Sequence, residues 1–269
     1  MVSFRDLNKA LRTLAIESNR PVLVHSSLSA FGQVAGGAET VLGALLGAFF
    51  TVVMPTFTYS TMVVPEIGPE HNGMQYGSAR DANRMAEFFR EDMPADRLMG
   101  RIPELLRNRP TATRSIHPIL SFSGINAEGL LVQQTLEEPF LPVNAMKRER
   151  GWVLLLGVDQ TVNSAIHYGE WAAGRKRFVR WALTTKGIVA CGFPGCSQGF
   201  QSIEPHIRSI TRQVPAGPAV IQAIPIPELT DTVVGLIEAD PLALLCERPD
   251  CELCNTVRAD VQRQEISNA

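Results

Sequence analysis

The sequence predicts an α/β fold in which helices cover both faces of a mainly parallel central sheet, with a small antiparallel extension toward the C-terminus. Three observations favour this fold. Residues 21–54 read as strand, glycine-containing loop, helix and strand, which is the order of a βαβ unit. Residues 152–158 form an uninterrupted apolar run, typical of a strand buried on both faces. Residues 178–183 and 187–191 indicate an antiparallel pair near a sheet edge.

Length and composition allow one domain with a large core. The chain has 269 residues, of which 45% are hydrophobic and 19% are charged. We expect a single domain over residues 1–269, with a C-terminal subregion from about residue 185 to 269. The formal net charge of −2 lacks the positive excess typical of proteins that bind nucleic acids or anionic membranes, so neither partner is expected.

The first elements follow from periodicity and cap residues. Ser3 precedes apolar residues spaced as on one face of a helix, so an N-capped helix is expected over residues 4–14. Residues 21–25 have the pattern of a short buried strand, residues 39–49 that of a second helix, and residues 51–54 that of the next strand. Together they make the expected βαβ unit.

The longest uncharged stretch, residues 40–65, exceeds the roughly 20 residues that cross a bilayer. Pro55 and Pro65 interrupt it, and hydroxyl-bearing side chains make its second half polar, so a helix, a strand and a loop are expected instead. The N-terminus lacks the apolar core of a signal peptide. Five cysteines, an odd number, do not fit a secreted disulfide framework. The sequence therefore predicts a cytoplasmic protein.

Further elements follow from local pattern. The segment 66–77 is rich in glycine, proline, asparagine and histidine and is expected to be a loop or a lid. Short helices are expected over residues 81–90 and 99–107. Other helices are expected over residues 164–173 and 227–239. The chain has no P-loop and no H-E-x-x-H motif, which disfavours a nucleotide hydrolase and a zinc protease.

A histidine and a glutamate follow the strand 152–158, at the strand end where ligands bind in open α/β sheets. His167 and Glu170 are three residues apart in the expected helix 164–173, so they share one face and Glu170 could orient the imidazole. This is the arrangement that a general base needs. The alternative is a structural histidine satisfied by a neighbouring carboxylate on a half-buried helix face.

Hydroxyl groups follow the first strand. The segment from His25 to Ser29 reads His-Ser-Ser-Leu-Ser, and Gly36 and Gly37 precede the next helix. Strand-end hydroxyls and free N–H groups at a helix start suit phosphate or carbonyl oxygens. The alternative is a glycine turn that serves only to start the helix.

Three basic segments could anchor an anionic cofactor, because guanidinium groups pair with phosphates bidentately. They are residues 97–100, 114–115 and 175–177. The last segment follows an expected helix, where cations meet the helix dipole favourably, and this is the alternative explanation. His117, which precedes Pro118, is expected to be structural.

Three of the cysteines lie close together near the C-terminus. Cys246, Cys251 and Cys254 have the spacing C-x4-C-x2-C, and Cys191 and Cys196 lie upstream. Thiolates at this spacing suit one side of a tetrahedral zinc site, which Cys196 or Cys191 could complete. The hypothesis is a structural zinc held by Cys196, Cys246, Cys251 and Cys254 that ties the C-terminal tail to the body. The alternative is a set of reduced, buried thiols.

Taken together, several segments resemble the aminoglycoside 3-N-acetyltransferase family. They occur in the family's order and cover roughly residues 20–175. The segments are 22–32, Gly36-Gly37, 54–58, Met99-Gly100, Ile102 to Glu104, Arg114-Ser115, His117-Pro118, 152–157 and 163–170. The remainder of the chain departs from the familiar pattern, so the resemblance specifies the donor better than the acceptor.

The resemblance implies acetyl-CoA as the donor. It places the family's catalytic histidine at His167 and its acidic partner at Glu170. It also implies that the hydroxyl of Ser164, three residues before the histidine, lies near the thioester. The residues that it assigns to the coenzyme A site are Ser26, Ser27, Leu28, Arg97, Met99, Gly100 and Ser164.

The activity that the resemblance implies is direct acetyl transfer to the 3-amino group of an aminoglycoside. His167 would take a proton from the amine as it attacks the thioester, backbone N–H groups would stabilise the oxyanion, and Glu170 would hold the imidazole. A polycationic acceptor favours an acidic pocket, for which Glu66, Glu70 and Asp81 are candidates. The alternatives are an acyltransferase of the same fold acting on another amine, and a coenzyme A-binding or zinc-stabilised protein without turnover.

Overall fold

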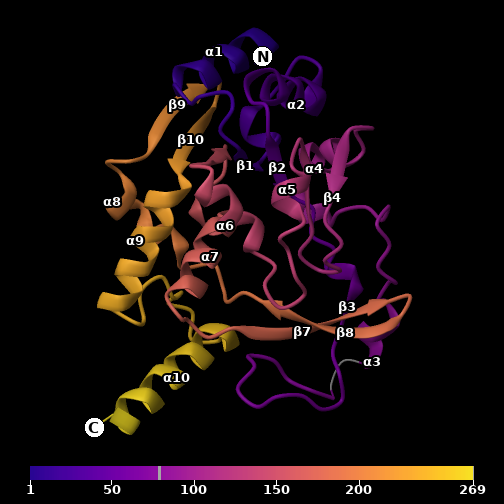
Figure 1. Ribbon diagram of the computed structural model, residues 1–269, viewed down its shortest axis with the longest axis vertical. Coiled ribbons are helices and arrows are strands. Elements are labelled where there is room, and N and C mark those ends of the chain that lie inside the picture. Colours follow the sequence, from indigo (N-terminus) through magenta and orange to yellow (C-terminus); the bar gives the residue numbers. More distant parts are fainter. Residues whose placement is uncertain (78–79, 269) are drawn as a thin grey trace.

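The computed structural model describes residues 1–77 and 80–268, and its centre is a seven-stranded sheet with the order β4-β5-β2-β1-β6-β10-β9 (Figure 1). The strands are β1 (Val22–Ser26), β2 (Val52–Pro55), β4 (Ala112–Arg114), β5 (Phe122–Ile125), β6 (Trp152–Leu156), β9 (Arg212–Ala216) and β10 (Ala219–Pro225). β1 lies in the middle of the sheet, between β2 and β6. The predicted α/β fold is confirmed.

The central sheet is mixed rather than mainly parallel. β1 pairs in parallel with β2 and with β6, and Val22 is the partner of both Val52 and Trp152. The outer pairings, β2 with β5, β5 with β4, β6 with β10 and β10 with β9, are antiparallel. The prediction of a mainly parallel sheet therefore holds only for the centre, because a βαβ pattern is local and does not determine the direction of flanking strands.

A separate three-stranded antiparallel sheet, β3-β7-β8, crosses the lower part of the body in Figure 1. β7 (Phe178–Thr184) and β8 (Gly187–Phe193) form the predicted pair, with Gly187 at its turn (φ +118°). β3 (Met62–Val63) pairs with the other edge of β7. The antiparallel extension is confirmed, but it forms its own sheet instead of an edge of the central one.

Helices cover both faces of the central sheet, as predicted. Side chains of β1 alternate between the faces, so Val22 and Val24 join one apolar cluster and Leu23 joins the other. One face carries α1 (Phe4–Thr13), α2 (Gly37–Ala48) and α4 (Arg101–Arg107), and the other carries α5 (Glu128–Leu131), α6 (Leu141–Arg148), α7 (Ser164–Ala172) and α9 (Ile226–Ala239).

The first helix begins where the sequence predicts, and the second begins at Gly37, before the predicted start at residue 39. The Ser3 hydroxyl accepts a hydrogen bond from the Asp6 amide, and the Asp6 carboxylate accepts one from the Ser3 amide, which makes a capping box. α2 follows two glycines with positive φ, Gly36 (+80°) and Gly37 (+61°). Only glycine adopts these angles readily, so the backbone conformation by itself accounts for the pair.

The other described helices differ more from the predictions. They are α3 (Arg80–Arg84), α8 (Glu204–Ile207), α10 (Glu252–Asn268) and 3-10 helices at Ser29–Phe31, Tyr59–Thr61, Arg97–Met99, Gln160–Val162 and Phe200–Ile203. The helix predicted over residues 81–90 ends at Arg84, and Gly100 (φ +84°) divides the one predicted over 99–107. Within residues 1–77 and 80–268, no helix combines the length and the apolarity required to traverse a lipid bilayer.

Candidate active site and cysteine cluster

His167 and Glu170 form a buried pair on α7, the helix that follows β6. Asn163 caps this helix by accepting a hydrogen bond from the Ala165 amide. His167 Nδ1 lies 2.8 Å from Glu170 Oε2, and the two residues are 8% and 2% exposed. An ionised carboxylate only accepts hydrogen bonds, so Nδ1 carries the proton of this contact and Nε2 keeps its lone pair. The pair can therefore take a proton at Nε2.

Two aromatic rings enclose the His167 imidazole. Phe140 stacks on it with a centroid distance of 5.5 Å and an interplanar angle of 29°, and Phe200 meets it edge to face at 4.7 Å. Phe140 lies just before α6, and Phe200 begins a 3-10 helix after β8. Both rings are buried, so they exclude water from the two sides of the imidazole and restrict its rotation.

The second oxygen of Glu170 contacts a buried arginine that follows α7. Arg175 Nη1 donates to Glu170 Oε1 at 2.9 Å. Arg175 Nη2 donates to the carbonyl oxygens of Pro241 and Ala243, both at 2.8 Å. The Arg175 side chain is 4% exposed, so it is engaged inside the protein and is not placed to anchor a phosphate from solvent.

The other basic candidates in segments 114–115 and 175–177 also have protein partners. Lys176 Nζ lies 3.7 Å from Asp260, and Arg177 Nη1 lies 2.8 Å from Glu138. The Arg114 guanidinium donates to three backbone carbonyls, and burial lowers its pKa to about 10. These contacts favour structural roles for both segments.

A second buried histidine, His25, lies beside the pair, although no role for it follows from the sequence. Its Nε2 is 3.2 Å from the hydroxyl of Ser164. Burial, with a further contribution from His167, lowers the pKa of His25 to about 3, so its ring stays neutral near pH 7. The signal that could have identified it is its place at the carboxyl end of β1, which lies against β6.

Ser26, Ser27 and Leu28 lie at the carboxyl end of β1. The Ser26 hydroxyl is buried and, among the described residues, has no hydrogen-bond partner. Ser27 Oγ lies 3.0 Å from Ser29 Oγ, and the Ser27 amide donates to the carbonyl of Leu156, the last residue of β6. The three residues therefore border the same end of the sheet as α7.

The segment 97–100 lies beside these serines. Arg97 and Met99 belong to a 3-10 helix, and Met99 packs against the apolar cluster that includes residues of α7. A Cβ placed on Gly100 would lie 3.9 Å from the carbonyl oxygen of Ser26. The structure thus brings together the two segments that the resemblance assigns to coenzyme A.

The three acidic candidates lie on the segment that follows β3. Glu66 and Glu70 are exposed in the segment 66–77, which contains no helix or strand, as predicted. The Asp81 side chain is 95% exposed on α3 and lies 3.4 Å from Arg84. Asp81 is thus engaged at the surface within its own short helix, and its contacts do not connect it to the buried pair.

The segment 66–77 packs against β7 and α10. The Asn72 side chain donates to the Val179 carbonyl and accepts from the Val179 amide. Arg180 donates to the Asn72 carbonyl. A Cβ on Gly73 would lie 2.9 Å from a side-chain carbon of Leu253, so the close approach to α10 requires glycine at this position.

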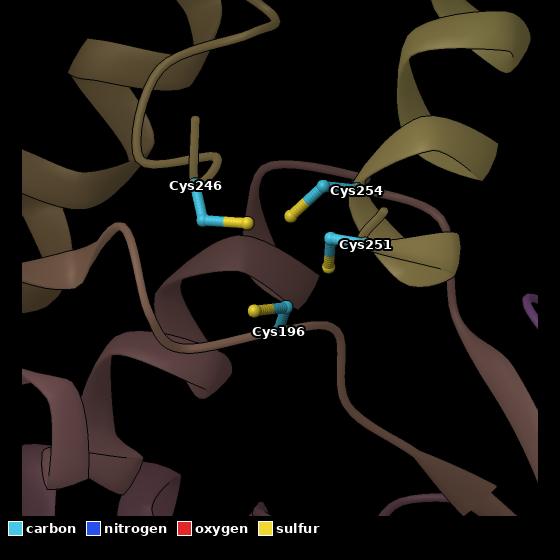
Figure 2. Close-up of side chains that lie close together, drawn as sticks. All are labelled: Cys196, Cys246, Cys251 and Cys254. Atoms are coloured by element: carbon cyan, nitrogen blue, oxygen red, sulfur yellow. The ribbon is translucent and has the colours of Figure 1, made fainter. Parts of the chain in front are cut away.

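Four cysteines converge where the C-terminal segment meets the body (Figure 2). Cys196 lies in the loop after β8, Cys246 follows α9, and Cys251 and Cys254 lie at the start of α10. Their sulfur atoms are all within 4.8 Å of one another. Cys191 is buried in β8 and is not part of this group.

The cysteine cluster has the donor set and the dimensions of a metal site. Four sulfurs at Zn–S distances of about 2.3 Å would be roughly 3.8 Å apart, which is within the spread observed here. A hydrogen bond from Cys254 lowers the pKa of Cys196 to about 5, and the same contact raises the pKa of Cys254. The cluster could hold a metal ion.

The sequence matches known acetyltransferases. A family model described as aminoglycoside 3-N-acetyltransferase matches residues 23–238. Aminoglycoside N(3)-acetyltransferase VII of Streptomyces paromomycinus is 34% identical over 183 residues, which are 64% of this chain and 62% of that protein. The SPbeta prophage-derived aminoglycoside N(3')-acetyltransferase-like protein YokD of Bacillus subtilis is 31% identical over 183 residues, 62% of this chain and 64% of that protein. The matches thus span less than two thirds of these relatives.

Solved structures agree with this assignment at the level of the fold. The apoenzyme of aminoglycoside acetyltransferase AAC(3)-IVa is similar with a TM-score of 0.77 and 23% identity, over 96% of this chain and 97% of that one. The YokD structure is similar with a TM-score of 0.72 and 25% identity, over 87% and 98%. Because the family model covers most of the chain, from residue 23 to residue 238, this protein belongs to the aminoglycoside 3-N-acetyltransferase family.

Proposed function

We propose that this protein is an acetyl-CoA-dependent N-acetyltransferase that acetylates the 3-amino group of an aminoglycoside. The observation that carries the proposal is the buried His167–Glu170 pair, which leaves His167 Nε2 available as a base in a chain of this family. Relatives of the same fold support the choice of ligands. AAC-IIIb was solved with CoASH, a mutant of AAC(3)-IVa with a gentamicin, and AAC-VIa with sisomicin.

His167 would act as the general base in a direct transfer. The acceptor amine attacks the thioester carbonyl while His167 Nε2 takes its proton, and the tetrahedral intermediate expels the coenzyme A thiolate, leaving an amide. The imidazolium returns its proton to the thiolate or to solvent. Glu170 holds Nδ1–H, fixes the ring and stabilises the cation that forms.

His25 is the other buried histidine near this site, and its properties do not suit a base. A base with a pKa of about 3 is largely unable to hold a proton taken from an amine near pH 7. His25 instead contacts Ser164. His25 Nε2 also accepts a hydrogen bond from the Ser164 amide at 3.4 Å, so the neutral ring carries its proton on Nδ1.

Coenzyme A binding is proposed for Ser26, Ser27, Leu28 and segment 97–100, including Arg97, Met99 and Gly100. Support comes from the position of the two segments at the carboxyl end of β1 and from the unpartnered, buried hydroxyl of Ser26. The amides of residues 164–166 already donate to other groups, so these three N–H groups are not free to bind the oxyanion.

The acceptor is proposed to approach from the side of the segment 66–77. Glu66 and Glu70 are exposed carboxylates there, which suits a substrate with several ammonium groups. Asp81 has the same charge, but its contact with Arg84 lowers its availability for a ligand. Charge complementarity with a polycationic acceptor supports these three residues.

We also propose that the cysteine cluster binds a structural zinc ion. Zinc bound there would supply a cross-link between the loop after β8 and the start of α10 and would take no part in the transfer. Purified protein should then contain about one zinc per chain, released in proportion to thiol modification. A content below about 0.2 zinc per chain, with no release by a thiol reagent, would contradict the proposal.

The activity can be tested by following free-thiol release from acetyl-CoA. The acceptors are gentamicin, apramycin, sisomicin and a set of simple amines, and the position of the new amide is assigned by NMR. Turnover with at least one aminoglycoside and acetylation at the 3-amino group are expected. Turnover only with other amines would favour an acyltransferase of different specificity, and no turnover with any acceptor would reject the enzyme assignment.

A further inference from the structure

Arg175 joins Glu170, five residues earlier, to a segment that lies 66 to 68 positions later in the sequence. One guanidinium nitrogen donates to Glu170 Oε1 at 2.9 Å. Another donates to the carbonyls of Pro241 and Ala243, both at 2.8 Å. In addition, the Arg175 amide donates to the Glu170 carbonyl, which fixes the chain at the end of α7. The arginine therefore contacts its carboxylate partner through both backbone and side chain.

The contact between Arg175 and Glu170 is buried, which makes it strong. The side chains of Arg175 and Glu170 are 4% and 3% exposed, so water does not screen them. The planar guanidinium presents its donors in a fixed fork and therefore defines the orientation of a carboxylate better than a lysine would. With Oε1 held in this way, Oε2 faces His167 Nδ1 at 2.8 Å.

The segment 241–243 is also connected through packing to Phe200, the second aromatic residue that encloses the His167 imidazole. Leu244 and Leu245 follow it directly, and Gly199 packs so closely on them that a Cβ there would lie 2.4 Å from the Leu244 carbonyl oxygen. Gly199 precedes Phe200, whose ring meets the His167 imidazole. The carboxylate and the imidazole are thus both supported by this packed C-terminal region.

We infer that Arg175 is a positioning residue for the transfer reaction, because it fixes the Glu170 carboxylate on the segment 241–243 and thereby aims Glu170 Oε2 at His167 Nδ1. This inference rests on the proposed function for its catalytic meaning. Arg175 acts through Glu170 and is not assigned a contact with either substrate.

The charge of Arg175 gives the inference a specific signature. Charged or titratable groups facing His167 are Glu170 on α7, His25 on β1 and, through Glu170, Arg175 after α7; Phe140 and Phe200 supply apolar contacts. Removing the positive charge leaves the carboxylate free to stabilise the imidazolium. The His167 imidazolium then loses its proton only at a higher pH. The acidic limb of the profile of kcat against pH therefore moves to higher pH.

The decisive comparison is between Arg175→Met and Arg177→Met. Arg177 is the matched control, because it carries the same charge two residues away and pairs with the half-buried Glu138 instead of Glu170. We expect Arg175→Met to lower kcat about 10- to 100-fold, with less than about a threefold change in the KM for acetyl-CoA. Its acidic limb should shift up by about one pH unit, whereas Arg177→Met should keep the wild-type limb.

Arg175→Lys provides the rescue variant. It restores the charge but not the fork, so we expect the acidic limb near its wild-type position and only partial recovery of kcat. If Arg175→Met does not fold, Arg175→Lys and Arg175→Gln make the same comparison. An unshifted acidic limb in both the methionine and the glutamine variants, or an equal shift in Arg177→Met, would overturn the inference.

A measurement without turnover separates this inference from the proposed function. The His167 imidazole can be titrated by NMR in the wild-type protein and in Arg175→Met, with the resonance assigned by its loss in His167→Ala. A raised imidazole pKa in Arg175→Met supports the positioning role even if no acceptor is acetylated. An unchanged pKa rejects that role even if the enzyme acetylates aminoglycosides.

Discussion

The His167–Glu170 pair is buried and the cysteine cluster is partly buried, and the two groups of ionisable side chains differ in how their charge is balanced. Each oxygen of Glu170 has a protein donor, one from His167 and one from Arg175. The thiols of the cysteine cluster have mainly one another as hydrogen-bond partners. Because a buried anion without a partner is unfavourable, the pair is complete as protein, whereas a bound cation would complete the cluster. Proton transfer suits the first arrangement and metal binding the second.

Removing the imidazole should have the largest effect on the pair. We expect His167→Ala to lower kcat by about 10²- to 10⁴-fold, because a positioned general base contributes that much. Steady-state thiol release measures the change, and thermal unfolding verifies the fold. His206→Ala, which removes an exposed imidazole on α8, should retain wild-type turnover. Near wild-type turnover of His167→Ala would show that another group is the base.

Loss of the metal from the cysteine cluster should lower the stability of the protein, whereas loss of the imidazole lowers kcat. We expect Cys254→Ser to lose the zinc and to lower the free energy of unfolding by about 4 kcal/mol, since loss of a structural metal belongs to the largest class of mutational effects. Metal analysis and urea unfolding measure both quantities. The control is Cys191→Ala, which removes a buried thiol outside the cluster and should keep the zinc. Equal metal content in the two variants would contradict the assignment.

Acid should destabilise the protein even where no metal is involved. Burial lowers the pKa of His25 to about 3 and that of His117 to about 4. In the unfolded chain each histidine has a pKa near 6.5, so between this value and the folded pKa the unfolded chain binds more protons than the folded protein. The stability that each neutral histidine contributes is therefore complete above pH 6.5 and is lost as the pH falls toward the folded pKa. From about pH 6.5 to about pH 5 each histidine costs about 2 kcal/mol.

His117→Asn tests this part of the comparison. His117 Nδ1 accepts hydrogen bonds from the amides of Ile119 and Leu120, and an asparagine oxygen can occupy a similar position. Urea unfolding at about pH 6.5 and about pH 5 should therefore show about 2 kcal/mol less loss in this variant than in the wild type. An identical loss in both proteins would mean that His117 is not the titrating group.

The smallest expected effect is at Phe200, which contacts His167 and follows Cys196 in the chain. Phe200→Leu should cost about 1 kcal/mol of stability and lower kcat about threefold, because the leucine fills most of the volume but not the edge that contacts His167. Phe31→Leu, a fully buried change on the other face of the sheet, should cost similar stability with kcat unchanged. Equal kcat values in the two variants would remove Phe200 from the description of the site.

Local features of the site could be predicted from the sequence. The apolar run 152–158 and the spacing of His167 and Glu170 are sufficient to place a histidine and a carboxylate on one face of a helix at a strand end. Their contact needs only one turn of helical geometry. The N-cap of α1 at Ser3 is predictable for the same reason.

Long-range features could not be predicted in this way. Arg175 finds carbonyl oxygens 66 and 68 positions later, and backbone carbonyls have no signature in a sequence. The choice between Cys191 and Cys196 depended on where β8 ends, because Cys191 is paired within the strand and Cys196 lies beyond it. Strand direction in β9 and β10 likewise depends on connections that local pattern does not reveal.

The contact between Arg175 and the segment 241–243 has a consequence for biosynthesis. His25 and Ser164, which are in contact, are 139 positions apart in the sequence. The residues whose carbonyls hold Arg175 are translated after both of them. A nascent chain ending before residue 241 would carry both members of the pair without the groups that hold Arg175 in place. The complete site would thus arise near the end of synthesis, so a ribosome-released fragment lacking the last segments would be expected to show the lowered kcat proposed for Arg175→Met.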